Sequence, residues 1–363
     1  MPERSKLPVE QWGDLNVSAG CRKRIRLQAG ESYTGVTAQL PLMIWRAKEP
    51  GPVVGITAAV HGNEINGTGT IRRIIQDSPF YLKSGALVLV PVVNLFGFER
   101  HSRYMPDRRD LNRGFPGSAQ GSLTARLANL IQTDVVARCD FLIDLHTAAV
   151  RRTNFPNVRG DLSDPGVKRL ANVFGCEIIV DGQGPDGSLR REACRAGCPT
   201  IVLEAGEVSK VEPLYQDTAL RGIQNVLIDL GMVEGTLEQA PHTVVIESTK
   251  WVRAGNGGFL EFHVAPGETV TKDQPLATNT GLLGQEHEVL NAPAEGIVLG
   301  MTTMPAVAPG DPVLHIGFTG TRREQRDLDT SVNNLDVGSL EEQVREHLAT
   351  NMMINPMEEE EAR

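Results

Sequence analysis

The 363-residue sequence has few of the features that mark secreted, membrane-spanning or nucleic-acid-binding proteins. It has five cysteines, an odd number, and no apolar signal segment at its start. No apolar run approaches the ~20 residues of a membrane span. The net charge of −9 argues against the general basic face that nucleic acids and anionic membranes require. We therefore expect a cytoplasmic protein without nucleic-acid or membrane partners, which could form a homo-oligomer.

Two common catalytic motifs are also missing. No G-x-S-x-G elbow occurs, because GSAQG (117–121) has its serine in the wrong position, and this disfavours a serine hydrolase. The glycines of NGTGT (66–70) do not complete G-x-G-x-x-G, which disfavours nucleotide binding. Cys194 and Cys198 are spaced C-x-x-x-C without a second pair, a weak signal for a metal or redox site.

Short apolar runs alternate with segments of helical period over residues 50–240, after an N-terminal segment at 1–49. The apolar runs predict buried strands at 53–60, 86–93, 141–146, 177–180 and 200–206. The periodic segments predict helices at 71–77, 122–138, 165–174 and 213–231, with Ser122 and Ser163 as starts and Gly231 as a stop. Continuous apolar strands separated by helices are typical of an α/β domain whose sheet, mostly parallel or mixed, is flanked by helices.

Residues 241–319 change to short β-prone runs broken by glycine and proline, which predicts a smaller all-β domain. An internal echo, VAPGETV (264–270) against VAPGDPV (307–313), resembles the tandem halves of the barrel-sandwich fold in biotinyl and lipoyl domains. The region between the halves, 281–296, lacks the lysine that carrier domains modify, so we expect no carried group. The polar tail at 320–363 predicts one helix at 339–349 and a partly disordered acidic end.

The stretch AAVHGNEING (58–67) places His61 and Glu64 three positions apart, where an apolar run stops and glycines begin. The glycines let the chain turn sharply, so both side chains can converge at the carboxyl end of the sheet, where open α/β folds bind ligands. Alone, H-x-x-E fits a polar turn as well as half of a metal site.

A third metal ligand is available in DLHT (144–147), because His146 also ends an apolar strand. Asp144, two residues earlier, points to the same face and could hold the imidazole, as carboxylates do around bound metals. Two histidines and one glutamate, with a fourth position left to water, form the ligand set of catalytic zinc. We predict one Zn²⁺ per chain, bound by His61, Glu64 and His146.

Hydrolysis at such a site also needs a group that takes and redelivers a proton. Glu204, at the end of TIVLEAG (200–206), is a carboxylate on a buried strand that reaches the same edge of the sheet. We predict Glu204 as the general base. Glu207, expected beyond the end of the strand, is the alternative.

The stretch RHSRYMPDRRDLNR (100–113) holds five arginines within an acidic protein. A positive pocket of this kind favours a small anionic ligand, although the arginines could instead pair with Asp107 and Asp110 in a solvated loop. Either Arg103 or Arg113 could stabilise an oxyanion, while the other binds a substrate carboxylate through two hydrogen bonds. The residues themselves leave both assignments open.

Four motifs in order resemble the succinylglutamate desuccinylase/aspartoacylase branch of the zinc carboxypeptidase-like M14 superfamily: HGNE (61–64), SRY…RDLNRGFPG (102–117), DLHT (144–147) and LEAGE (203–207). The resemblance spans about residues 50–235, and the β domain at 243–318 fits the C-terminal domain of that family. It implies a zinc carboxypeptidase-like fold for the α/β domain and zinc binding by His61, Glu64 and His146.

The same resemblance implies roles for the remaining polar residues of these motifs. Glu204 would activate water, and Arg103 would polarise the scissile carbonyl. Asn112 and Arg113 would bind a substrate carboxylate, with Asp110 positioning the arginines. These roles predict a zinc-dependent amide hydrolase that deacylates a small N-acyl amino acid or a similar carboxylate-bearing substrate.

Two other functions remain as alternatives. A metallocarboxypeptidase acting on short peptides would use the same metal, base and arginines, and the size of the pocket would separate the two enzymes. A non-catalytic zinc-binding protein is disfavoured, because structural zinc normally has four protein ligands, often cysteines. RRTNFPNVR (151–159), with Arg151, Arg152 and Arg159, and Arg190 of DGSLRRE (186–192) could complete the pocket or face solvent.

Overall fold

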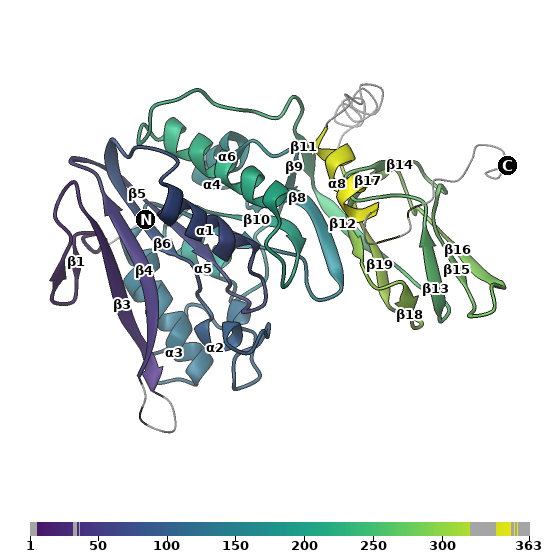
Figure 1. Cartoon of the computed structure of the whole chain (residues 1–363), viewed down its shortest axis with the longest axis horizontal. Coiled ribbons are helices and arrows are strands. Elements are labelled where there is room, and N and C mark those ends of the chain that lie inside the picture. The colour runs from purple at the N-terminus through teal and green to yellow at the C-terminus, as the bar shows by residue number, and fades with distance from the viewer. Residues whose placement is uncertain are drawn as a thin grey trace.

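The computed structural model describes residues 6–31, 35, 37–319, 339–349, 352 and 354. A large mixed β-sheet runs through it, with helices packed against one part and an all-β region at the other end (Figure 1). In spatial order the main path of the sheet is β12 (Ser248–Arg253), β19 (Pro312–Phe318), β17 (Gly296–Thr302), β8 (Arg152–Gly160), β10 (Thr200–Glu207), β7 (Phe141–His146), β5 (Glu49–Ala58), β6 (Ser84–Val90), β4 (Thr37–Arg46) and β3 (Arg22–Glu31).

The centre of this sheet is the parallel part that the sequence predicted. Strands β10, β7, β5 and β6 pair in parallel, and nearly all residues of β6 and β7 are buried, because helices cover both faces. In the register of β7 with β10, His146 lies opposite Glu204. The fold therefore places these two side chains next to each other at one edge of the sheet.

Two groups of helices cover the two faces. On one face pack α1 (Asn66–Asp77), α4 (Pro165–Phe174) and α6 (Pro213–Asp229). On the other lie α3 (Leu123–Leu130) and α5 (Leu189–Arg195), and the short α2 (Leu95–Phe98) leads into the arginine-rich loop. The face covered by α3 and α5 has its own hydrophobic cluster, which includes Leu127 and Leu189.

The helix ends follow the capping chemistry of the sequence, with two corrections. Ser122 caps α3 by accepting a hydrogen bond from the backbone N–H of Ala125, as predicted, and α6 ends just before Gly231, which has a φ of +68°. Asp164, not Ser163, caps α4. The predicted helix at 122–138 is continuous but irregular, since a π-helical turn at Ile131–Val135 and a 3₁₀ turn at Val136–Arg138 follow α3.

The C-terminal region is all β, as predicted, and it is joined to the large sheet. Strands β13 (Gly258–Phe262), β15 (Pro275–Thr280), β16 (Glu286–Asn291) and β18 (Ala306–Val307) form a separate antiparallel sheet. In contrast, β17 pairs with β8, and β11 (Val244–Ile246) pairs with β9 (Ile178–Asp181). The hairpin between β15 and β16 carries Leu282 and Leu283 at its exposed tip.

Helix α8 (Leu340–Ala349) corresponds to the helix predicted in the C-terminal tail. Its buried Val344 and Leu348 pack against the hydrophobic core. Arg345 pairs with Glu268 of the β region at 2.7 Å, and His347 contacts Glu212 beside α6 at 2.9 Å. Most of the remaining tail, for which we predicted partial disorder, lies outside the described residues.

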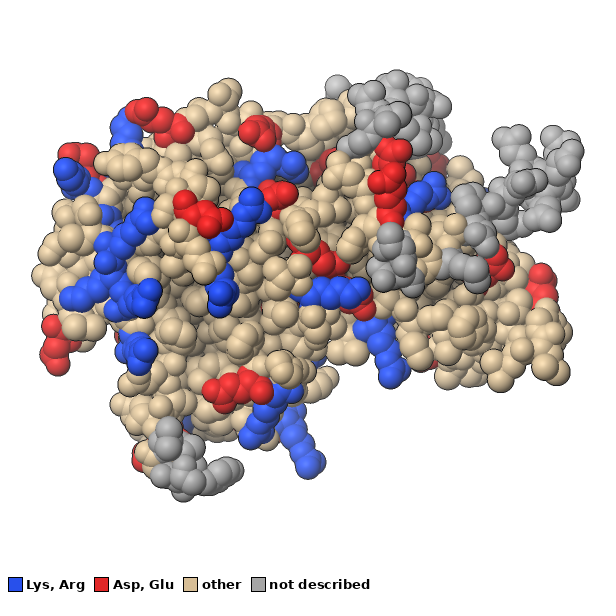
Figure 2. Space-filling view, in the orientation of Figure 1, with Lys and Arg blue, Asp and Glu red and all other residues tan. Residues whose placement is uncertain are grey.

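The N-terminal strands add to the large sheet. Strands β3 and β4, which were not predicted, extend the large sheet beyond β6 as an antiparallel pair. Among the described residues, no helix is both long enough and apolar enough to cross a membrane. On the face shown in Figure 2, basic and acidic side chains are interspersed among uncharged ones.

Candidate metal and catalytic site

The loop between β5 and α1 carries His61 and Glu64 and is held in a constrained conformation. Ala59 has a φ of +52°, an uncommon value for a residue with a side chain. Gly62 lies so close to the backbone of Gly97 and Phe98 that a Cβ atom would overlap them. The small residue therefore lets the loop turn tightly enough to bring His61 and Glu64 to the edge of the sheet.

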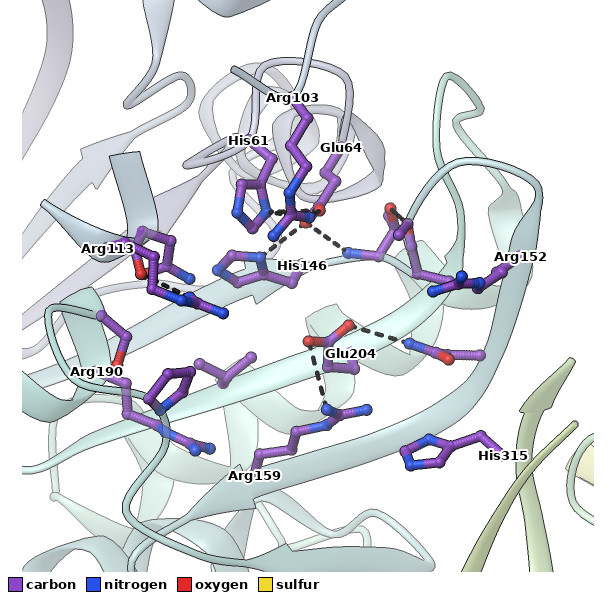
Figure 3. Close-up of a pocket in the computed structure, with 18 of the residues that line it drawn as sticks. His61, Glu64, Arg103, Arg113, His146, Arg152, Arg159, Arg190, Glu204 and His315 are labelled. Atoms are coloured by element: carbon purple, nitrogen blue, oxygen red, sulfur yellow. Dashed lines mark hydrogen bonds and ion pairs between the residues drawn. The ribbon is translucent and has the colours of Figure 1, made fainter. Parts of the chain in front are cut away.

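Three predicted metal ligands converge at this edge (Figure 3). Donor atoms of His61, Glu64 and His146 all lie within 4.8 Å of one another, and the three residues are buried. Nδ1 of His61 lies 2.6 Å from one carboxylate oxygen of Glu64, and Nδ1 of His146 lies 2.7 Å from the other. The backbone N–H of Thr147 also donates to Glu64.

The second nitrogen of each imidazole faces a different carboxylate. Nε2 of His146 lies 2.8 Å from Asp144, which itself accepts a hydrogen bond from the hydroxyl of buried Thr57. Nε2 of His61 lies 3.1 Å from Asp110. In this arrangement the Nε2 protons are held by carboxylates and both Nδ1 atoms face one point, which suits a divalent metal ion. Asp144 was predicted in this position, whereas the contact of Asp110 with His61 was not.

The protonation of these residues is shaped by their mutual contacts. Burial alone would lower the pKa of His146, but the charges of Asp144 and Glu64 raise it well above its ordinary value. Burial would raise the pKa of Glu64, yet the two histidines lower it. A metal ion bound here would take the place of the protons that otherwise separate these groups.

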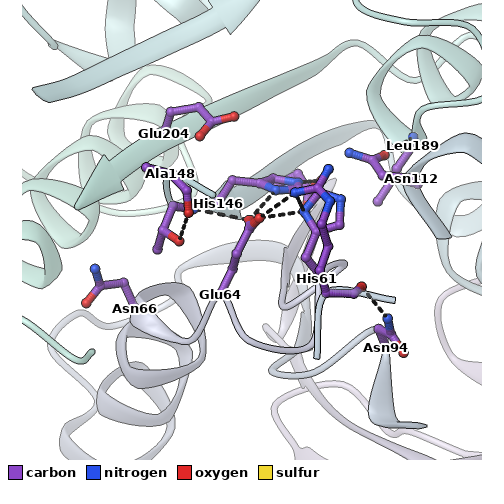
Figure 4. Close-up of polar contacts among 12 residues, drawn as sticks. His61, Glu64, Asn66, Asn94, Asn112, His146, Ala148, Leu189 and Glu204 are labelled. Carbon is purple, nitrogen blue, oxygen red and sulfur yellow. Dashed lines mark hydrogen bonds and ion pairs between the residues drawn. The ribbon is translucent and has the colours of Figure 1, made fainter. Parts of the chain in front are cut away.

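Arg103 lies directly beside the candidate metal ligands. Its guanidinium donates to Asp110 at 2.9 Å and to Glu64 at 3.3 Å. The side-chain amide nitrogen of Asn94 donates a hydrogen bond to the backbone carbonyl of Arg103 (Figure 4). The side-chain oxygen of Asn94 accepts a hydrogen bond from the backbone N–H of Gly97, so Asn94 fixes the conformation of this loop. We predicted that Asp110 positions the arginines of this loop, and the structure contains this interaction between Asp110 and Arg103.

Asn112 and Arg113 line another side of the same cavity. The side-chain oxygen of Asn112 accepts a hydrogen bond from the backbone N–H of Leu189 at 2.8 Å, which leaves the amide nitrogen available. Arg113 donates to the backbone oxygen of Asn112 and makes no ion pair among the described residues. Its charge is thus available for an anionic ligand.

Glu204 extends from β10 into the cavity beside the metal ligands. One carboxylate oxygen accepts a hydrogen bond from Asn154 at 3.1 Å, and the other lies 3.9 Å from the guanidinium of Arg159. Glu207 is the last residue of β10, so the expectation that it lies beyond the strand is wrong. It accepts a hydrogen bond from Thr303 and pairs with Lys210, and it is absent from the lining of the cavity.

The cavity has a volume of about 260 Å³, and several of its lining residues were not assigned from the sequence. They come from β8, from α5 and from the C-terminal strands: Arg152, Asn154, Arg159, Arg190, Trp251 and His315. The sequence left open whether the arginines of the stretches 151–159 and 186–192 line the pocket or face solvent. Arg152, Arg159 and Arg190 line the pocket, whereas Arg151 is exposed and does not.

The comparison with known families assigns this part of the chain. Residues 50–230 match the profile described as the succinylglutamate desuccinylase/aspartoacylase catalytic domain. The chain belongs to this family. The matched span contains the three candidate metal ligands and Glu204, so the resemblance inferred from four short motifs is confirmed.

Individual relatives of this desuccinylase/aspartoacylase family member are distant in sequence but close in fold. N-alpha-acetyl-L-2,4-diaminobutyric acid deacetylase of Halomonas elongata is 24% identical over 307 residues, which cover 80% of this chain and 88% of the relative. A crystal structure of a succinylglutamate desuccinylase/aspartoacylase from Rhodobacter sphaeroides superposes with a TM-score of 0.72 at 24% identity, covering 83% of this chain and 96% of that one. The product-bound ectoine utilization protein EutE of Ruegeria pomeroyi superposes with a TM-score of 0.74 at 21% identity, covering 87% and 100%.

Proposed function

We propose that the protein is a zinc-dependent hydrolase that removes the acyl group from a small N-acyl amino acid or a similar carboxylate-bearing amide. The observation that carries this proposal is the convergence of His61, Glu64 and His146 beside Glu204 at one edge of the sheet. The named members of the family, a desuccinylase and an aspartoacylase, and the deacetylase of Halomonas elongata support the same class of reaction.

His61, Glu64 and His146 would hold the zinc ion through two imidazole nitrogens and one carboxylate. Zinc in such a site supplies a Lewis acid and makes water acidic enough to ionise near neutral pH. Asp144 and Asp110 keep the two imidazoles in the tautomer that presents Nδ1, since each carboxylate accepts a hydrogen bond from the Nε2–H of its histidine.

Glu204 acts as the general base in this proposal. Its carboxylate accepts a proton from the attacking water and then delivers it to the amide nitrogen, which leaves as the amine while the acyl group leaves as a carboxylic acid. Asn154 and Arg159 hold the carboxylate from β8, so that Glu204 faces the cavity. Glu207 is held by Thr303 and Lys210 instead and is not proposed as the base.

Arg103 and the pair Asn112 and Arg113 bind the substrate in two places. Arg103 lies at the metal ligands, where a guanidinium can stabilise the negative charge that develops on the carbonyl oxygen. Arg113 can donate two hydrogen bonds to the carboxylate of the substrate, and the amide of Asn112 can add a third.

The cavity is of a size that suits a small substrate. At about 260 Å³ it lies close to the lower end of the roughly 300–1,000 Å³ that is usual for ligand pockets, and this supports the proposal of a small acyl amino acid. All five cysteines are free, which supports our proposal of a reducing compartment, the cytoplasm, as the location.

The experiment that tests this function is a hydrolysis panel with the full chain loaded with zinc. N-acetyl and N-succinyl amino acids are compared with dipeptides and tripeptides that end in the same residues. We expect release of free amino acid from at least one N-acyl amino acid, with kcat/KM above that of every peptide. Hydrolysis of peptides alone would establish the carboxypeptidase. If the zinc-loaded protein hydrolyses neither N-acyl amino acids nor peptides, both enzymes are excluded.

A further inference from the structure

The candidate metal ligands and the general base lie on different elements of the chain. His61 and Glu64 belong to the metal loop, residues 59–65 between β5 and α1, whereas Glu204 belongs to β10. The segment 205–212 connects β10 to α6 and passes beside the metal loop, because the backbone N–H of its Ser209 donates to the carbonyl of Asn63 at 2.8 Å. The distance between the base and the metal ligands therefore depends on contacts between these two segments.

Strand β10 is irregular directly after Glu204. Its register with β8 shifts between Glu204 and Gly206, which marks a β-bulge. Gly206 has a φ of +75°, and a Cβ atom at this position would overlap a carboxylate oxygen of Glu212. Bulges next to active sites change the direction in which a side chain points. The direction of Glu204 thus depends on the groups that hold the bulge.

Asn66, the first residue of α1, binds this bulge from the side of the metal loop (Figure 4). Its side-chain nitrogen donates to the carbonyl of Ala205 at 3.3 Å and to the carboxylate of Glu212 at 2.9 Å. Its side-chain oxygen accepts a hydrogen bond from the backbone N–H of Glu212 at 2.7 Å. Asn66 lies two residues after Glu64 and is only 4% exposed. One buried amide therefore joins the metal loop to the residue that follows the base.

Glu212 holds the other side of the bulge. The carboxylate oxygen that binds Asn66 also accepts a hydrogen bond from the backbone N–H of Glu207 at 3.2 Å. The second oxygen lies 2.9 Å from Nε2 of His347 on α8. A buried carboxylate is costly without such partners, and Glu212 is buried. Neither Asn66 nor Glu212 is among the residues that line the cavity, so their contacts serve to position other groups.

We propose that Asn66 and Glu212 are positioning residues, which fix Glu204 relative to the metal loop and so set the rate of hydrolysis. This inference rests on the proposed function. A general base must lie within hydrogen-bond reach of the proton that it accepts, so a small displacement of Glu204 relative to His61 and Glu64 slows the reaction. Loss of either positioning residue should therefore lower kcat and change KM little, because neither residue lines the cavity.

The variants Asn66→Ala and Glu212→Ala test this role with the zinc-loaded full chain and the best substrate of the panel. We expect kcat to fall by about 10- to 100-fold, since a displacement of about 1 Å can cost this much, and KM to change by at most about threefold. Glu212→Gln should recover most of the wild-type kcat, because its side-chain oxygen can still accept from Asn66 and Glu207. Wild-type kcat in both alanine variants, or a loss confined to KM, would overturn the proposal.

Asn225 of α6 provides a matched control for effects on stability. It is also a buried asparagine that joins two segments through three hydrogen bonds, since it accepts from the backbone N–H of Glu238 and donates to the carbonyls of Glu238 and Phe174. It does not line the cavity. Asn225→Ala should lower the Tm about as much as Asn66→Ala does, but it should keep the wild-type kcat. An equal loss of kcat in the two variants would show that Asn66 acts only through general stability and would overturn the proposal.

The visible spectrum of the protein loaded with Co²⁺ in place of zinc separates this inference from the proposed function. Absorption bands of Co²⁺ depend on its coordination geometry, so they report the arrangement of the metal ligands without hydrolysis. We expect Asn66→Ala to change the position or intensity of these bands and Asn225→Ala to keep the wild-type bands. If the wild type hydrolyses no compound of the panel, the deacylase proposal fails and the spectra decide alone. A change confined to Asn66→Ala then supports the positioning role, and identical bands in Asn66→Ala and wild type refute it.

Discussion

Asp144 holds the imidazole of His146 from the side opposite Glu64, with Oδ2 of the carboxylate 2.8 Å from Nε2 of the ring. The two residues are two positions apart on β7, so strand geometry alone directs both side chains to the same face. Thr57 on the neighbouring strand β5 fixes the other oxygen of Asp144. The orientation of the candidate metal ligand is thus built into the centre of the sheet.

This relationship predicts that Asp144→Asn weakens zinc binding without unfolding the protein. Asparagine can still accept the hydrogen bond from Thr57, but it no longer stabilises the proton on His146 as a carboxylate does. We expect a loss of about 10- to 100-fold in zinc affinity, measured by competition with a chelator. Asp161, a partly exposed residue outside the cavity whose carboxylate accepts hydrogen bonds from Ser163, gives the control variant Asp161→Asn. Equal zinc affinities in the two variants would contradict the role of Asp144.

Removal of a ligand should have a larger effect than removal of its partner. In His146→Ala the zinc content should fall from about one ion per chain to background, because the two remaining protein ligands do not form a stable site. Metal analysis of the purified protein after dialysis measures this, with circular dichroism as the check on folding. Zinc content equal to that of the wild type would remove His146 from the site.

The sequence predicted the strands that can be recognised from neighbouring residues alone. The strands at 86–93, 141–146 and 200–206 are continuous apolar runs, and they became β6, β7 and β10 with small changes in bounds. His146 ends β7, and Glu204 lies opposite it near the carboxyl end of β10, so their convergence followed from the parallel pairing of these strands. The family motifs added the site residues that lie in loops.

What the sequence left open depends on contacts between distant segments. Strand β8 contains Asn154, Pro156 and Asn157, so its composition does not predict a buried strand, and its pairing with β10 and β17 forms it. Trp251 and His315 reach the cavity only because the C-terminal strands join the same sheet. The contact of Asp110 with His61 likewise requires the loop at 100–117 to fold back over the site.

Glu268 in the β region should make stability depend on pH. Burial raises its pKa to about 7 from the ordinary 4.5, despite its ion pair with Arg345 on α8, and Glu341 on the same helix adds to the increase. Because the folded pKa is the higher one, the stabilising contribution is complete below the unfolded pKa and is lost as the pH rises through about 7.

The variant Glu268→Gln should therefore remove part of this dependence, because glutamine resembles the protonated acid. Between pH 5 and pH 8 the free energy of unfolding of the wild type should fall relative to the variant, by at most about 3 kcal/mol. Urea titrations at both pH values measure the difference. Glu286→Gln, at an exposed position of β16, serves as the control, and a variant that keeps the wild-type dependence would show that Glu268 does not titrate as described.

Glu204 and Glu207 provide a matched pair for the general base, since both lie on β10 only three residues apart. Glu204→Gln should lower kcat by at least about 100-fold, the lower end for general acid–base catalysis, with zinc content and fold retained. Glu207→Gln should keep most of the activity, because Glu207 contacts Thr303 and Lys210 rather than the cavity. Steady-state kinetics on the best substrate of the panel decides, and the opposite result would reassign the base to Glu207.

Arg113 should select substrates that carry a carboxylate at its side of the cavity. It makes no ion pair among the described residues, and its guanidinium can bind both oxygens of a carboxylate, with Asn112 as a further donor. Lysine keeps the charge but loses the paired donors. We therefore expect Arg113→Lys to reduce kcat/KM by roughly 1.5–3 kcal/mol in transition-state free energy, with zinc retained.

A comparison of the free acid of the substrate with its primary amide separates this effect from general damage. In the wild type the acid should be hydrolysed faster, because the amide offers only one acceptor to the guanidinium and carries no charge. In Arg113→Lys most of that advantage should disappear, while the rate on the amide changes little. If the wild type hydrolyses acid and amide equally well, Arg113 does not bind a carboxylate, and the carboxylate-bearing substrate class proposed for this cavity is wrong.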